Sequence, residues 1–89
     1  MPVDPLHVPE QFQHLIPLAE TWGINDDGYR AAKLKAASSQ ELSLLKEMVL
    51  PLTNALYLDW LGDTGQLDTD AEETYLAFTA LVLAAEEAP

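Results

Sequence analysis

Apolar residues recur with the period of an α-helix along most of this chain. The first apolar stripe consists of Phe12, Leu15, Ala19 and Trp22. Pro9 suits the first position of a helix, where a missing N–H loses no hydrogen bond, and Gly23 suits a helix end at which φ is positive. Because Pro17 interrupts the stripe, we predict one kinked helix over residues 9–22, with two short helices that meet near Ile16 as the alternative.

A second, shorter helix is predicted after this first one. Side-chain oxygens that accept hydrogen bonds from free N–H groups and suit the helix dipole are supplied by Asn25, Asp26 and Asp27. The apolar face of this helix consists of Tyr29, Ala32 and Ala36. A face this narrow predicts a peripheral helix, which we expect to end near Ala37. Asp26 and Arg30 stand four residues apart, a spacing that favours an ion pair on the helix surface.

The third predicted helix begins at a capping box, in which the side chains of Ser38 and Glu41 each bond the other residue's backbone N–H. Its apolar stripe consists of Leu42, Leu45, Val49, Leu52 and Leu56. Pro51 lies inside this helix and predicts a second kink, because proline cannot donate the usual backbone hydrogen bond.

The last predicted helix follows a second capping-box match, which pairs Thr69 with Glu72. Its apolar residues are Ala71, Tyr75, Phe78, Val82 and Ala85 on one stripe, with Leu76, Leu81 and Leu83 outside that stripe. An apolar surface this broad predicts either a central helix or a helix that meets another molecule.

No sustained alternation of apolar and polar residues, as in a β-strand, competes with these helices. We therefore predict an all-α fold, a compact bundle of about four helices with kinks at Pro17 and Pro51. A chain of 89 residues suits a single helical domain over 1–89. Three prolines within the first nine residues predict an extended N-terminal arm over 1–8.

Composition excludes several classes of protein. The net charge of −11, from 15 acids against 4 Lys and Arg, predicts a surface that nucleic-acid phosphates would repel. The absence of Cys excludes disulfides, thiolate metal sites and a Cys nucleophile. The start of the chain lacks the pattern of a secretory signal, and no apolar segment approaches the roughly 18 residues of a membrane span. We therefore expect a cytoplasmic protein that binds neither nucleic acid nor membrane.

Carboxylates are concentrated toward the end of the chain, where residues 59–89 contain eight of them and no Lys or Arg. Their oxygens suit Ca²⁺ or Mg²⁺, but neither Asp59 nor Asp68 begins a register with the Gly and Glu of an EF-hand loop. Glu10 and His14 stand four residues apart, yet no His-Glu-x-x-His pattern surrounds them. The sequence also lacks a Gly-x-Ser-x-Gly turn. We therefore expect no catalytic residue, no metal ligand and no cofactor.

The two tryptophans each precede a glycine-bearing turn, where a large ring either seals the core or anchors an interface. We favour core sealing for both Trp22 and Trp60. The phrases at 18–24 and 75–78 are similar to those of small helical proteins of bacteria, a likeness that assigns no residue a role.

The leading hypothesis is a small non-enzymatic protein-binding or regulatory module whose partner is a basic protein. An immunity or inhibitor protein is one specific form of it. The candidate partner-binding residues are Asp59, Trp60, Asp63, Asp68, Asp70, Glu72 and Glu73. Within this class, a homodimer formed through the last helix is almost equally favoured. The alternative class is a carboxylate-based protein that binds a divalent metal, or a small enzyme, using the segment 59–73.

Overall fold

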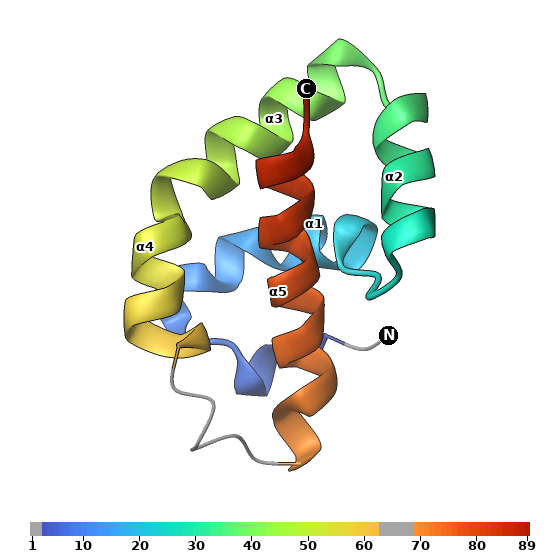
Figure 1. The fold of residues 1–89 in the computed structure, drawn as a ribbon. Coiled ribbons are helices and arrows are strands. Elements are labelled where there is room, and N and C mark those ends of the chain that lie inside the picture. Colours follow the sequence, from blue (N-terminus) through green and yellow to red (C-terminus); the bar gives the residue numbers. More distant parts are fainter. Residues whose placement is uncertain (1–2, 63–68) are drawn as a thin grey trace.

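The computed structural model describes residues 3–62 and 69–89, and every regular element in them is helical (Figure 1). The elements are, in chain order, η1 (Pro5–His7), η2 (Glu10–Leu15), α1 (Ile16–Trp22), α2 (Asp27–Ala36), α3 (Ser39–Val49), η3 (Leu50–Leu52), α4 (Thr53–Leu56), η4 (Tyr57–Leu61), η6 (Thr69–Ala71) and α5 (Glu72–Glu87). Of the short elements, η4 has the wide turn of a π-helix, and η1, η2, η3 and η6 are 3-10 helices. The predicted all-α bundle is confirmed.

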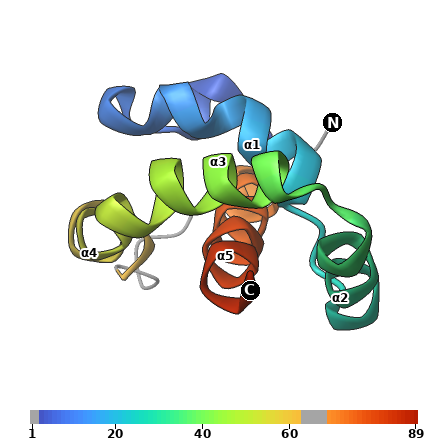
Figure 2. The ribbon, with the colours of Figure 1, turned by 90° about the horizontal axis from the view of Figure 1, so that it is seen from above.

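The last helix, α5, is the central helix of the bundle. Both α1 and α3 pack against it, and α2 and α4 lie on opposite sides of it in the two views of Figure 1 and Figure 2. The buried residues of α5 are Thr74, Ala77, Phe78, Ala80, Leu81, Val82, Ala84 and Ala85. Of the two explanations for the broad apolar surface of this helix, the structure confirms the central position in the core.

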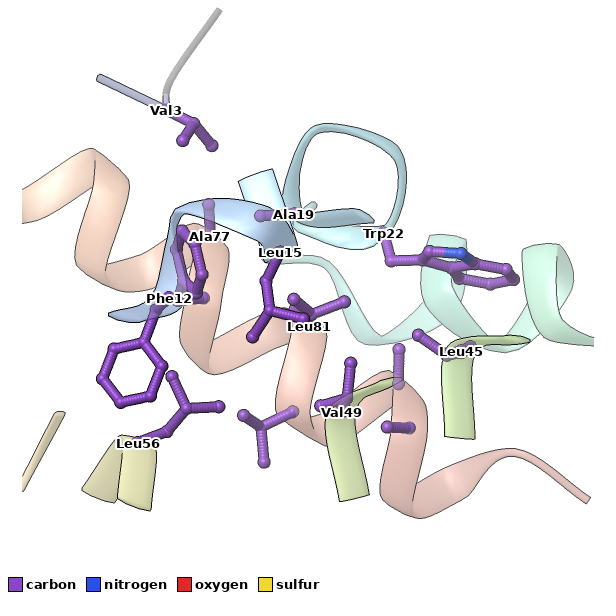
Figure 3. Packing of buried hydrophobic residues seen from close by; sticks show 14 of the residues in the cluster. Val3, Phe12, Leu15, Ala19, Trp22, Leu45, Val49, Leu56, Ala77 and Leu81 are labelled. Carbon is purple, nitrogen blue, oxygen red and sulfur yellow. The ribbon is translucent and has the colours of Figure 1, made fainter. Parts of the chain in front are cut away.

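Side chains from three segments meet in the core at Leu15, Val49 and Leu81 (Figure 3). All three side chains are fully buried, and the burial of each contributes about 1.5–3 kcal/mol to folding. The same cluster of buried apolar side chains includes Phe12 from η2 and Leu56 from α4. It therefore joins the first third of the chain to the last helix.

Both prolines at which a kink was predicted lie at a change of helix type. The chain passes from η2 directly into α1 at Ile16, and Pro17 lies in the first turn of α1. Pro51 lies in η3, which separates α3 from α4. Because proline has no N–H to donate to the preceding turn, the α-helical hydrogen bonding is interrupted at both places.

The N-terminal arm was predicted to be extended, but part of it folds into η1 and the arm docks on α5. The Asp4 carboxylate caps η1, with 3.0 Å between Asp4 Oδ1 and the Leu6 nitrogen. The backbone N–H of Asp4 donates to the Thr74 hydroxyl of α5 at 2.9 Å. Val3 and Val8 are buried. Apolar burial and this long-range hydrogen bond therefore outweigh the extended preference of the prolines.

Two of the predicted helix starts are confirmed. The carboxylate of Asp26 is the N-cap of α2 and accepts a hydrogen bond from the Tyr29 nitrogen at 2.8 Å. The capping box of α3 is complete, because the Ser38 hydroxyl accepts from the Glu41 nitrogen and the Glu41 carboxylate accepts from the Ser38 nitrogen. Short-range polar signals therefore set the start of both helices.

Two other predictions about helix ends are wrong. Gly23 ends α1 with a φ of −83°, so this glycine is not required by a positive φ. The α-helical part of the last helix begins at Glu72, after η6, and its N-cap is Ala71 without a side-chain hydrogen bond. Thr69 therefore does not form the predicted capping box, because a 3-10 turn displaces the start of α5.

Helix α2 buries a different face from the one predicted. Arg30 and Leu34 are buried. The predicted face residues are instead exposed, namely Tyr29, Ala32 and Ala36. Arg30 is only 4% exposed, and its Nε donates to Glu87 Oε2 at 3.2 Å. Its Nη2 donates to Asp27 rather than forming the predicted pair with Asp26. A charge-assisted contact with α5 therefore decides which side of α2 faces inward.

Candidate partner-binding surface

The described carboxylates of the predicted site gather at one end of the molecule. This acidic end consists of Asp59 in η4, Asp70 in η6, and Glu72 and Glu73 in the first turn of α5, all of them exposed. A hydrogen bond joins its two parts, in which the Tyr75 hydroxyl donates to the Leu61 carbonyl oxygen at 2.7 Å. In Figure 1 both parts lie at the lower end, where η4 (gold) ends and α5 (orange) begins. The candidates Asp63 and Asp68 lie outside the described residues.

The first turn of α5 is a favourable place for two of these carboxylates. The first N–H groups of a helix lack partners within the helix and form the positive end of its dipole. The N-cap residue Ala71 supplies no side-chain hydrogen bond. Glu72 and Glu73 therefore provide favourable negative charge in the first turn, an effect worth about 0.3–1 kcal/mol for each carboxylate.

A π-helical turn exposes two side chains beside the acidic end. The Gly62 N–H donates to the Tyr57 carbonyl oxygen, five residues back, at 2.7 Å. A Cβ on Gly62 would overlap the Tyr57 carbonyl oxygen, so this close approach favours glycine. Leu58 is 84% exposed and Asp59 is exposed, whereas Leu61 is buried. The sequence pattern gave no signal of this turn, a type that is frequent at functional sites.

Trp60 seals the core at the same end of the molecule. Its ring is half-buried and stacks on Phe12, with the ring centroids 6.2 Å apart. The edge contact with Phe78 is closer, at 4.9 Å between centroids. Aromatic pairs of this kind contribute about 0.5–1.5 kcal/mol beyond the burial of their area. The ring therefore belongs to the core, and only its exposed part is open to a partner.

The Asp59 carboxylate and the Tyr57 hydroxyl of η4 each interact with neighbouring residues. Asp59 Oδ2 accepts a hydrogen bond from Gln11 Nε2 at 3.0 Å, which orients this carboxylate and ties η4 to η2. Partial burial raises the pKa of the Tyr57 hydroxyl above its ordinary value of 10.0, and the nearby Glu86 and Tyr75 raise it further. The phenol is therefore neutral at physiological pH and adds no charge to this surface.

All of the Lys and Arg side chains lie away from the acidic end. They are Arg30, Lys33 and Lys35 in α2 and Lys46 in α3. Lys33 Nζ lies 5.4 Å from the centroid of the Trp22 ring. Lys46 Nζ donates to the Pro89 carbonyl oxygen at 2.7 Å, beside the end of α5. The positively charged side chains of the protein therefore lie around α2 and near the C-terminal end of α5.

The acidic end consequently keeps most of its negative charge uncompensated. Within residues 3–62 and 69–89, none of the four cations forms an ion pair with Asp59, Glu72 or Glu73. A group of exposed carboxylates without nearby cations creates a negative potential, which attracts a positively charged partner.

The residues that the structure describes contain neither a metal-ion site nor a membrane-spanning helix. No group of three or more His, Asp or Glu side chains is arranged to hold a metal ion in the described residues. Nor does any described helix have both the length and the apolar character needed to cross a bilayer. No known family model, curated protein or solved structure gives a significant match to this chain.

Proposed function

We propose that this protein is a non-enzymatic binding module that captures a basic protein through its acidic end. One observation carries the proposal: Asp59, Glu72 and Glu73 are exposed and form no ion pair within the described part of the chain, while every Lys and Arg lies in α2 or α3. A surface of one charge steers a partner of the opposite charge and raises its association rate.

The acidic end is also partly ordered before any partner binds. Gln11 orients Asp59, and the first turn of α5 carries Glu72 and Glu73. A preorganised surface loses less conformational entropy on binding than a mobile one. An inhibitor or immunity protein, which acts by covering a basic surface of an enzyme or toxin, is the specific form that these features favour.

The first test is capture followed by kinetics. The immobilised protein should retain a basic protein from a cell extract, and we expect the association rate of that protein to fall steeply with added salt. The physical reason is screening, because the Debye length falls from about 30 Å at 0.01 M to about 8 Å at 0.15 M salt. An association rate that does not change with salt would contradict electrostatic capture.

A matched pair of variants tests the location of the site. Glu72→Gln/Glu73→Gln removes two charges from the acidic end, whereas Glu20→Gln/Glu86→Gln removes two exposed charges elsewhere. Both variants have the same net charge. We expect the first to slow association several-fold more than the second, because charges at the rim of an interface act mainly on the association rate. Equal slowing would mean that only the net charge affects association, and the acidic end would then not be the binding site.

Self-association is tested by light scattering over a concentration series at low and moderate salt. Because Phe78 and Leu81 are fully buried within the chain, α5 offers little apolar surface to a second copy. We therefore expect the mass of a monomer. A dimer would mean that a second copy occupies part of the exposed surface. That result would count against capture of a basic protein by the acidic end.

A further inference from the structure

The elements α3, η3, α4 and η4 follow one another as a single bent rod beside α5 (Figure 1, Figure 2). One side of the rod faces the core and buries Leu45, Val49, Leu56 and Leu61. Exposed residues lie on the opposite side of the rod in all four of its elements. The rod therefore presents a long helical surface to its surroundings.

Residues on this outer side have the spacing of a helix-packing seam. The outer stripe consists of Gln40, Leu44, Glu47, Pro51, Asn54 and Leu58, all of them exposed. Successive members are four or three residues apart, as in the seam along which one helix packs against another. All six residues remain exposed through the change of helix type at η3, so the stripe stays outside the core.

Leucines stand near both ends of the outer stripe. Leu44 is 49% exposed and Leu58 is 84% exposed. A shallow hollow of ≈ 370 Å³ adjoins the first leucine and is lined by Ser39, Gln40, Ser43, Leu44 and Glu47. The two leucines are 14 residues apart, or roughly 20 Å along a helix. A partner helix of about four turns matches that length.

Charge favours a cationic occupant over a second copy of the chain. The only Lys or Arg of the rod is Lys46, whose Nζ is engaged with the Pro89 carbonyl oxygen at 2.7 Å. The outer stripe itself contains Glu47 and ends beside Asp59. A second copy would bring another net charge of −11 to this face, and like charges across an interface are unfavourable.

We propose that the outer stripe is the docking site for an amphipathic, positively charged helix of the partner protein. Leu44 and Leu58 bind the apolar side of that helix, and Glu47 and Asp59 attract its Lys and Arg side chains. This inference rests on the proposed function, since it takes the same basic partner, and it adds the secondary structure and the apolar anchors that this partner must supply. An amphipathic helix that places its apolar side on a complementary surface is a recurrent mode of recognition.

The probe for the test is a synthetic peptide of about 18 residues, built from Leu and Lys with Leu at the two seam positions of each heptad. A scrambled peptide of the same composition is the control for charge. Fluorescence anisotropy measures the binding of each peptide to the full chain, to Leu44→Ser/Leu58→Ser, and to Leu6→Ser. Leu6 is 91% exposed and lies in η1, outside the stripe. Thermal melts of the variants check that each one is folded.

We expect the patterned peptide to bind the full chain about 10-fold or more tightly than the scrambled one, because only the former presents a continuous apolar side. The double variant should weaken binding by about 10-fold, which corresponds to about 1.4 kcal/mol for the two truncated anchors together. Leu6→Ser should change the affinity by less than about twofold. Equal binding of the two peptides, or unchanged binding by the double variant, would overturn the docking site.

Two further outcomes separate this inference from the proposed function. If Glu72→Gln/Glu73→Gln slows capture of the basic protein while Leu44→Ser/Leu58→Ser does not affect its affinity, the proposed function stands and the docking site is wrong. If light scattering finds a dimer that Leu44→Ser/Leu58→Ser dissociates, the stripe is an interface between copies and the inference is overturned.

Discussion

Gly23, at the end of α1, is in close contact with Ala77 of α5. A Cβ on Gly23 would overlap the Ala19 carbonyl oxygen of α1 itself, and it would also lie 2.7 Å from the Ala77 carbonyl oxygen and 2.9 Å from the Ala77 Cβ. The backbone of α1 therefore touches the central helix at a point where no side chain fits. We predict that Gly23→Ala separates the two helices and lowers the free energy of unfolding by about 1–3 kcal/mol, the usual cost of overpacking. Urea denaturation followed by far-UV circular dichroism measures the change.

Gly28 provides the matched control for this substitution. It lies in the first turn of α2, and a Cβ there would meet only Asp26 Oδ1, at an ordinary contact distance of 3.5 Å. Gly28→Ala should therefore leave stability unchanged or raise it by up to about 1 kcal/mol, because alanine restricts the unfolded chain. Similar destabilisation by both alanines would show that the contact between Gly23 and Ala77 is not the cause.

Phe78→Ala tests the assignment of α5 to the core. Phe78 is fully buried and packs edge-on against the Trp60 ring. Removal of a buried aromatic ring costs about 3–5 kcal/mol, which is a large share of the total stability of a domain of this length. We expect a large fall in the midpoint of thermal unfolding. Leu6→Ala, at a 91% exposed position, should stay within about 0.5 kcal/mol of the parent. A loss of stability below about 1 kcal/mol for Phe78→Ala would mean that Phe78 does not belong to the core.

Most of the fold was predictable because local signals and apolar periodicity agree in it. Pro17 and Pro51 mark the two interruptions of helical hydrogen bonding, since the chemistry of proline acts on its own turn. Asp26 and Ser38 cap their helices as predicted. Each of these effects depends on residues within four positions of one another, which is the range that a sequence pattern can show.

Two of the departures depend on contacts between distant segments. The inward face of α2 was predicted wrongly because Arg30 is buried against Glu87, which is 57 positions away. Periodicity counts an arginine as polar and cannot anticipate that its partner lies on another helix. Val3 and Val8 are likewise buried because the arm meets α5. The fold brings the described acids of the candidate site to one end of the molecule and places the Lys and Arg residues in α2 and α3.

The contact between Arg30 and Glu87 leads to a prediction about stability. Arg30 is only 4% exposed, whereas its partners Asp27 and Glu87 are 94% and 45% exposed. Glu87→Gln leaves the guanidinium in its buried site with weaker compensation, and we expect a cost of about 1–2 kcal/mol. Arg30→Met keeps most of the buried volume and leaves both carboxylates facing water, so its cost should stay below about 1 kcal/mol.

Chemical denaturation of the two single variants and of Arg30→Met/Glu87→Gln measures how strongly the two side chains are coupled. In the double variant the loss from Glu87→Gln should disappear, because the buried charge that it leaves uncompensated is no longer present. Additive losses would show that the two side chains act independently. A larger loss for Arg30→Met than for Glu87→Gln would mean that the bonds of the guanidinium are net stabilising.

The raised pKa of Tyr57 makes stability depend on pH in the alkaline range. Burial of the phenol is the main cause, and the charge of Glu86 and the nearby Tyr75 add to it. The unfolded chain releases this proton near 10.0, whereas the native protein holds it to a higher pH. The unfolded state therefore binds fewer protons in that interval, and the free energy of unfolding decreases as pH rises. The contribution is fully present below 10.0 and is lost as pH passes through the native pKa.

Tyr57→Phe removes the titrating hydroxyl and should flatten the alkaline part of the stability curve. Urea denaturation of this variant and of the parent at a series of pH values above 9 isolates the effect, because the lysines titrate in both proteins. Glu86→Gln should lower the native pKa of Tyr57 only in part, since burial is the larger cause. Absorbance titration of the phenolate measures that shift. Parallel stability curves for the parent and Tyr57→Phe would mean that the hydroxyl is as well solvated in the native state as in the unfolded one.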